Sequence, residues 1–215
     1  MKKLASFMFV LALLVPLGAS GAPSAAGTAT PTHLTPGAAN DLHRIETYLN
    51  GLHNIEADFI QVDDSGGMLR GKIDISRPGK MRVTYAPPDK DFIIADGDFV
   101  HIWNSDLKAQ TNVPQDSSLA EFILRDPIKL DSGDVTVTGM RHSPTLIAIT
   151  LEQTKDPAAG SLTLIFEDHP LMLRQWRVTD AEGRTTGVTL QNVSTGVAFP
   201  PNTFFFVPPT FENNP

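Results

Sequence analysis

The stretch GKIDISRPGKMRVTYAPP, residues 71–88, predicts two β-strands that meet at the turn Pro78-Gly79. Alternate side chains of a strand point to the same face of a sheet, and one face of this hairpin is apolar. That face carries Leu69 from just before the stretch, then Ile73, Ile75, Met81, Val83 and Tyr85. Arg77 falls on the same face, at the end of the first strand. The pattern therefore indicates a sheet with one buried face and a guanidinium at its rim.

Strand-like segments continue along most of the chain. They are separated by connections such as ADGD, RHSP, EDHP and DAEGR, whose Gly, Pro, Asp and Ser residues are typical of hairpin turns. Beyond the first hairpin the segments are DFIIAD, FVHIWNSD, VTVTGMR, TLIAITLEQ, SLTLIFED, LMLRQWRVTD, TTGVTLQNV and TFFFVPP. This succession predicts one antiparallel meander, with no repeat period and no second domain.

A helix is predicted before the first strand. Apolar residues recur there at spacings of three and four, as on one face of an amphipathic helix. They are Leu42, Ile45, Leu49 and Leu52. We expect Asp41 near the N-cap and Gly51 near the end. A strand through Phe59 and Gln61 should follow.

A second, shorter helix is predicted in DSSLAEFILRDP. Its apolar stripe consists of Leu119, Phe122 and Ile123. Ser117 or Ser118 is a candidate N-cap, and Pro127 follows the end.

One long sheet with two short helices has a face that something must cover. The expected fold is therefore mainly β (α+β). A single strongly curved antiparallel sheet would form an unclosed β-barrel, with the short helices as a lid over its concave apolar side.

Composition excludes several classes of protein. The 215 residues include no cysteine, so disulfides, thiolate metal sites and lipid attachment through a cysteine are excluded. Acidic residues outnumber basic ones by 24 to 17, and a nucleic-acid partner is not expected.

The N-terminus resembles a secretory signal. Lys2 and Lys3 precede a short apolar run that Pro16 interrupts, followed by small residues. We expect a signal peptide at residues 1–22, with cleavage somewhere between 20 and 26, and an uncleaved anchor as the less favoured alternative. A flexible leader at 23–40 and one folded domain at 41–215 should follow. In a two-membrane bacterium the mature protein would be periplasmic.

Patterns of catalysis are weak. Ser65 lies in DDSGG, residues 63–67, which resembles the surroundings of a protease nucleophile, but we favour a hairpin turn because Asp, Ser and Gly are the residues expected there. The six histidines show no metal-ligand spacing. We therefore predict no catalytic residues, no metal and no cofactor, and regard an enzyme as the less economical hypothesis.

Four segments together resemble the outer-membrane lipoprotein carrier family, LolA. They are ADFIQ, GKIDISRPGKMRVTY, IIADGDFVHIWNSD and FFFVPP, and the resemblance spans about Asp41 to Pro209. It implies an unclosed barrel with a helical lid over an apolar cavity. It also implies that the acyl chains of a lipoprotein are received from an inner-membrane ABC transporter of the Lol type. They would then be passed to an outer-membrane lipoprotein acceptor by a monomeric carrier.

The resemblance extends to single residues. Arg77 matches an arginine that hydrogen-bonds the lid backbone in the closed, empty form. Met81 falls at the cavity mouth, Arg82 matches a second family arginine, and Val83 replaces a common aromatic residue. The expected cavity lining is Phe59, Leu69, Ile73, Ile75, Met81, Val83, Tyr85, Leu119, Phe122 and Ile123.

Three alternatives stay open. Arg77 could cap a sheet edge above an ordinary core. The chain could carry or sense another amphiphile, since one fold serves several ligands. Least favoured is a hydrolase with an unrecognised site.

Overall fold

The computed structural model describes residues 27–117 and 121–209. The strands are β1 (Asn54–Asp63), β2 (Met68–Ser76), β3 (Lys80–Tyr85), β4 (Phe92–Asp96), β5 (Phe99–Asn104), β6 (Ala109–Pro114), β7 (Val135–His142), β8 (Leu146–Gln153), β9 (Gly160–Glu167), β10 (Met172–Asp180) and β11 (Thr185–Thr195). The helices are α2 (Pro36–Asn50), α3 (Glu121–Leu124) and the short 3-10 turns η2 (Gln115–Ser117) and η3 (Pro157–Ala159). The predicted signal peptide, Ser118 and Leu119 lie outside the described residues.

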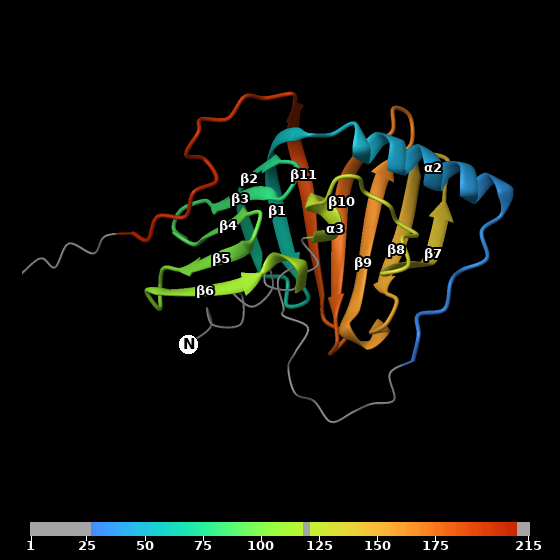
Figure 1. Ribbon diagram of the computed structural model, residues 1–215, viewed down its shortest axis with the longest axis horizontal. Helices are drawn as coiled ribbons and strands as arrows, with labels where there is room; N and C mark the ends of the chain where they lie inside the picture. The colour runs from blue at the N-terminus through green and yellow to red at the C-terminus, as the bar shows by residue number, and fades with distance from the viewer. Residues whose placement is uncertain (1–26, 118–120, 210–215) are drawn as a thin grey trace, which may run out of the picture.

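All eleven strands form one antiparallel sheet, in the order β6-β5-β4-β3-β2-β1-β11-β10-β9-β8-β7. Within the described ranges, β6 and β7 pair with one neighbour each, so the sheet curls without closing (Figure 1). The predicted mainly-β class and the unclosed barrel with a helical lid are confirmed. Of the helices in these ranges, none has the length and apolar character needed to cross a bilayer.

The opening hairpin folds as its pattern predicts. Ile73 pairs with Val83 and Ile75 with Met81, and all four side chains are buried. The turn requires Gly79, whose φ is 79°. A Cβ there would lie 3.0 Å from the backbone of Gly97. Local sequence therefore determines both strands and the turn between them.

Helix α2 lies across the half of the sheet formed by β7 to β11 (Figure 1). Its buried residues Leu42, Ile45 and Leu49 belong to the same apolar cluster as the inner faces of these strands. Tyr48 meets Phe166 of β9 edge to face, with ring centroids 6.0 Å apart. At β9 the interior of the barrel is therefore packed core.

The start of this helix was predicted wrongly. Thr35 is the N-cap, its hydroxyl accepts from the Ala38 amide at 3.3 Å, and Pro36 occupies the first turn. Proline is favourable there because its missing N–H would have no helical partner.

Of the leader expected at 23–40, the structure describes residues 27–40, and residues 36–40 belong to α2. Residues 27–35 lie along the edge of the sheet, where Ala29 donates to Thr154 O at 3.0 Å and Thr32 to Val137 O at 2.8 Å. Small residues without periodicity gave no sign of this edge pairing.

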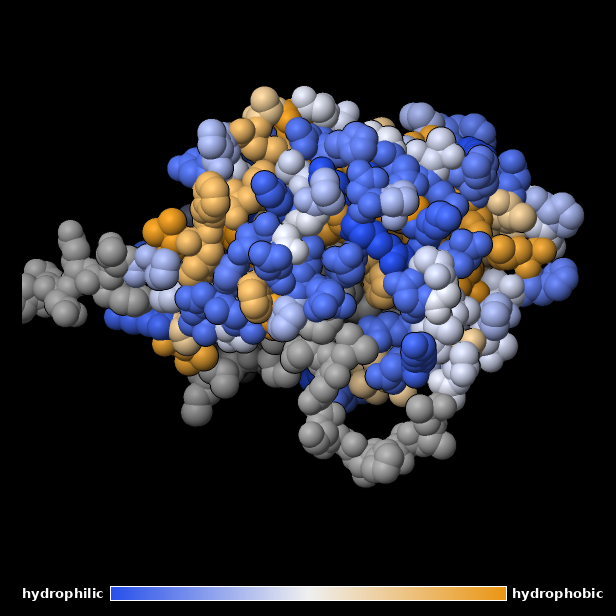
Figure 2. Space-filling view, viewed as in Figure 1, coloured by the Kyte–Doolittle hydropathy of each residue, from blue (hydrophilic) through white to orange (hydrophobic). Residues whose placement is uncertain are grey.

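Two strand predictions need correction. The polar strand β6, AQTNVP, was missed because only Val113 and the neighbouring Gln115 are buried. The segment TFFFVPP is not a strand: its flanking prolines lack N–H donors, and Phe206 instead packs on Phe92 and His101. Figure 2 shows apolar surface over this C-terminal segment, where Phe205 and Val207 are exposed.

Candidate functional site

A small apolar cavity lies between the two helices and the sheet. Its volume is about 40 Å³. Its wall consists of Leu49, Leu52, Ile55, Ala57, Ile73, Ile75, Arg77, Ile123, Ile128, Leu173, Trp176 and Leu190. On this measure of volume one water needs about 10 to 15 Å³, so the cavity has room for only a few waters, and an acyl chain could enter only if the helices moved.

The structure brings some of the predicted lining residues together and separates others. Ile73, Ile75, Ile123 and Arg77 share the cavity wall. Met81 and Val83 are buried in the adjoining core, and Leu69 and Phe122 are half-buried against it. Phe59 and Tyr85 pack edge to face, with centroids 5.5 Å apart. They line a separate open pocket of about 430 Å³ beside Gly71.

Sequence patterns did not reveal Leu173 and Trp176. A β-bulge between Leu173 and Gln175 shifts the register of β10 against β9. Leu173 and Trp176 therefore reach the same cavity although they are three residues apart, which a period of two places on opposite faces. Leu190 could have been found, because it alternates with the buried Val188.

Arg77 joins the sheet to both helices. Its Nη2 donates to Leu49 O in the last turn of α2, and its Nε donates to Leu52 O at 2.6 Å, two residues after the helix ends. Its Nη1 donates to Arg125 O at 3.3 Å, directly after α3. Burial lowers the pKa of the Arg77 guanidinium, but arginine stays protonated in proteins. These contacts therefore join a permanent cation to backbone carbonyls of both helices.

Among the described residues, few further contacts attach α3. Gly79 N donates to Leu124 O at 2.9 Å, which links the hairpin turn to the end of the helix. Leu124 is fully buried, while Phe122 and Ile123 are only partly so. Arg125 pairs with Asp134 at 2.6 Å and stacks over Phe122 at 5.1 Å. A four-residue helix has little stability of its own, so these contacts hold it.

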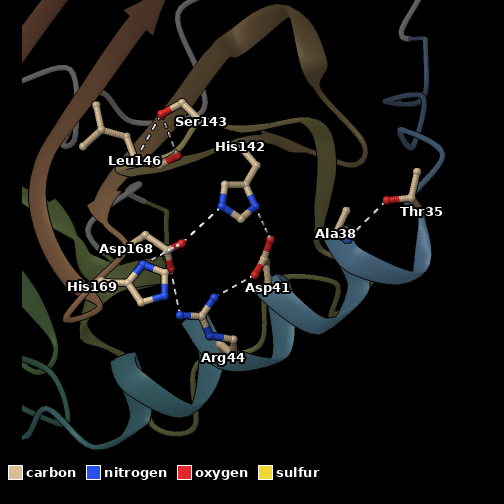
Figure 3. Close-up of polar contacts among 9 residues, drawn as sticks. All are labelled: Thr35, Ala38, Asp41, Arg44, His142, Ser143, Leu146, Asp168 and His169. Atoms are coloured by element: carbon tan, nitrogen blue, oxygen red, sulfur yellow. Dashed lines mark hydrogen bonds and ion pairs between the residues drawn. The ribbon is translucent and has the colours of Figure 1, made fainter.

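The other end of α2 is held by a cluster of five charged or titratable side chains (Figure 3). Arg44 bridges Asp41 and Asp168, at 2.8 Å each. His142 lies between the same two carboxylates, at 2.9 Å from Asp41 and 3.2 Å from Asp168, and His169 also contacts Asp168. The hydrogen bond from Arg44 lowers the pKa of Asp168. Helix α2 is thus anchored to the end of β7 and to the β9–β10 turn.

The residues considered for catalysis lie in ordinary turn geometry. Asp63 accepts from the amide and hydroxyl of Ser65 and from the amide of Gly67, at 2.6 to 2.8 Å. Ser65 is exposed, and among the described residues its hydroxyl is paired with Asp63 rather than with a histidine. In the part of the chain that the structure describes, no three His, Asp or Glu side chains gather as metal ligands would.

The comparisons with known proteins point in one direction. The profile of the family described as "Outer membrane lipoprotein carrier protein LolA" matches residues 50–207, which confirms the resemblance predicted from the sequence. An outer-membrane lipoprotein carrier protein of Chromobacterium violaceum is 25% identical over 88% of this chain and 92% of its own length. One of Xanthomonas campestris pv. campestris is 28% identical over 76% and 82%. Both relatives are named as carriers rather than enzymes.

Among solved structures, a DUF1329 family protein from Desulfovibrio piger superposes with a TM-score of 0.49 at 12% identity. It covers 78% of this chain and 96% of that one. This likeness is too loose to bear on function.

Proposed function

The chain belongs to the family of outer-membrane lipoprotein carrier proteins, LolA, and on that premise we propose that it is a periplasmic carrier that binds lipoprotein acyl chains. It would receive them from an inner-membrane ABC transporter of the Lol type and deliver them to an outer-membrane acceptor. The predicted signal peptide supports the periplasmic location. No catalytic step is part of this function.

One observation carries the proposal: Arg77 bridges both helices over an apolar cavity that is too small for a chain. This is the geometry expected of an empty carrier with its lid closed. Leu49 and Leu52, whose carbonyls accept from Arg77, also line the cavity. Opening the cavity from this side would therefore strain or break the Arg77 contacts.

The energy of acyl binding explains why such contacts are useful. Each buried methylene contributes about 0.8 kcal/mol, so one sixteen-carbon chain would gain about 12 kcal/mol. A cargo held this tightly could not be released. Hydrogen bonds to a charged group contribute roughly 1.5 to 3 kcal/mol each. Regaining the Arg77 contacts and the apolar packing of α3 would offset part of the gain and make transfer reversible.

The test is solubilisation of a lipoprotein. Purified mature protein would be added to spheroplasts of a two-membrane bacterium that are synthesising a tagged outer-membrane lipoprotein. We expect the tagged protein to appear in the soluble fraction as a complex with the carrier. A form whose acylated cysteine is replaced by serine is the matched control and should not be captured.

Failure to solubilise the acylated form would contradict the proposal. Recovery of phospholipid, without acylated protein, in mass spectra of the purified carrier would instead favour the alternative of a carrier for another amphiphile.

A further inference from the structure

One residue of the cavity wall carries a buried hydrogen-bond donor that has no acceptor among the described residues. The indole Nε1 of Trp176 is shielded from solvent, and no described residue accepts a hydrogen bond from it. Trp176 is 6% exposed and lines the cavity together with Leu173 and Leu190. Buried indole N–H groups usually find an acceptor, because leaving one unpaired costs free energy. An apolar side chain of similar size would fill this position without that cost.

The surface that faces the closed cavity is almost wholly apolar, so the polar atoms of the lining residues lie behind that surface. The residues that line the cavity are apolar except for Trp176 and Arg77. An indole N–H and a guanidinium are both donors with no acceptor capacity. A water molecule at this wall would also need acceptors for its own hydrogens, because an ordered buried water needs two to four polar partners. A group that only accepts hydrogen bonds matches this wall better.

An acylated protein carries such a group. The ester and amide carbonyls that join fatty acids to a lipidated N-terminus accept hydrogen bonds and donate none, and they lie directly beside the apolar chains. Ile73 and Ile75 lie on the same face of β2, and Arg77, directly after the end of the strand, lines the same cavity. A chain whose carbonyl lay near Arg77 could therefore run along Ile75 and Ile73.

We propose that the Trp176 indole N–H donates a hydrogen bond to an ester or amide carbonyl of the bound acyl group. Trp176 is then a specificity-determining residue: the carrier recognises the acyl linkage as well as the hydrocarbon. When α2 and α3 move away, Arg77 loses its backbone acceptors and offers further donors at the same rim. This inference rests on the proposed function, since it concerns the same cavity.

The experiment compares two ligands and three proteins. One ligand is a synthetic lipopeptide with two palmitoyl esters and one palmitoyl amide. The other is its analogue with ether and alkylamine linkages, which has the same chain lengths and no linkage carbonyl. Both ligands would be titrated into wild type, Trp176→Phe and Trp103→Phe. The last variant is the matched control at the other tryptophan.

We expect Trp176→Phe to weaken binding of the ester ligand about tenfold, as for one lost hydrogen bond, and to leave the ether ligand unchanged. Trp103→Phe should bind both ligands like wild type. Equal weakening for both ligands, or no change for either, would overturn the role of Trp176. If wild type bound neither ligand, the proposed function would fail instead.

A second measurement avoids dependence on how Trp176→Phe folds. In Trp103→Phe the remaining indole signal in a ¹H–¹⁵N spectrum belongs to Trp176. Its proton should move downfield with the ester ligand and not with the ether ligand. Identical shifts with both ligands would contradict the hydrogen bond.

Discussion

Arg77, directly after the end of β2, donates hydrogen bonds to backbone carbonyls at the ends of two helices. A loss of its guanidinium leaves carbonyls of Leu49, Leu52 and Arg125 without their donor. We predict that Arg77→Leu favours the open, loaded form and slows transfer of bound lipoprotein to an outer-membrane acceptor by at least about tenfold, the effect of one charged hydrogen bond.

The matched control for this prediction is Arg70→Leu, which removes the same charge from the exposed face of the same strand. Transfer kinetics with acceptor-containing membranes would measure both variants. Equal transfer rates for Arg77→Leu and wild type would contradict the proposal that Arg77 holds the closed form. Arg77 would then be only a cap of the sheet edge.

Gly71 is a second residue with a defined steric role. A Cβ at this position would lie 2.2 Å from Thr84 O and 2.7 Å from the ring of Phe59. The aromatic pair of Phe59 and Tyr85 therefore depends on the missing side chain. We predict that Gly71→Ala lowers the free energy of unfolding by about 1 to 3 kcal/mol or more, as overpacked cores do.

Denaturant titration would measure this change. Gly139→Ala is the control, because the nearest contact of its Cβ would be 3.4 Å from Thr150. Equal losses of stability in the two variants would show that strand propensity, rather than crowding at Phe59, sets the effect.

At the scale of elements, α3 differs from the strands of the sheet in its length and in how it is attached. It has four residues, one fully buried side chain and a few polar attachments. Segments with little buried apolar surface open at low free-energy cost. We predict that amides 121–125 exchange faster than those at 73–75 and 162–166, and that an acylated peptide changes exchange at 121–125 while leaving the two strand segments nearly unchanged.

Hydrogen exchange followed by mass spectrometry would measure this, with an unacylated peptide as the control. If 121–125 were as protected as the strands and unaffected by the acylated peptide, α3 would be an ordinary part of the core.

At the scale of the whole molecule, the cluster around Asp168 connects segments far apart in the chain. Arg44 reaches Asp168 across 124 positions, so unfolding must break this contact. Because the pKa of Asp168 is lowered in the folded state, its contribution to stability is present above the carboxyl pKa of the unfolded chain. It is lost as the pH falls through the folded value. We predict that Asp168→Asn lowers stability at neutral pH and makes the acid-side decline of stability shallower.

Thermal unfolding between about pH 3 and pH 7, the range around carboxyl titration, would measure both effects. Glu167→Gln serves as the control. It removes the carboxylate next to Asp168 in the chain, which is more exposed and pairs with Arg174. A pH profile of Asp168→Asn parallel to that of wild type would contradict the assigned role of this carboxylate.

Much of the fold was predictable because its signals are local. Alternation along β2 and β3, with a turn at Pro78-Gly79, determines the hairpin and the face that carries Arg77. Signals were absent where the stabilising partner is distant. Strand β6 is polar and owes its existence to pairing with β5, and residues 29 and 32 are held by backbone acceptors at 154 and 137.

The sequence by itself determined the mainly-β class, the apolar row from Leu69 to Arg77 and the absence of cysteine chemistry. Only the tertiary structure decided which apolar residues line a cavity and which fill the core. In the structure Phe59 and Tyr85 line a separate pocket, and a bulge in β10 places Leu173 and Trp176 on one wall of the cavity. The physical reason is that the local strand determines to which face of the sheet a side chain points. Whether that side chain meets packed core or a cavity depends on elements from elsewhere in the chain.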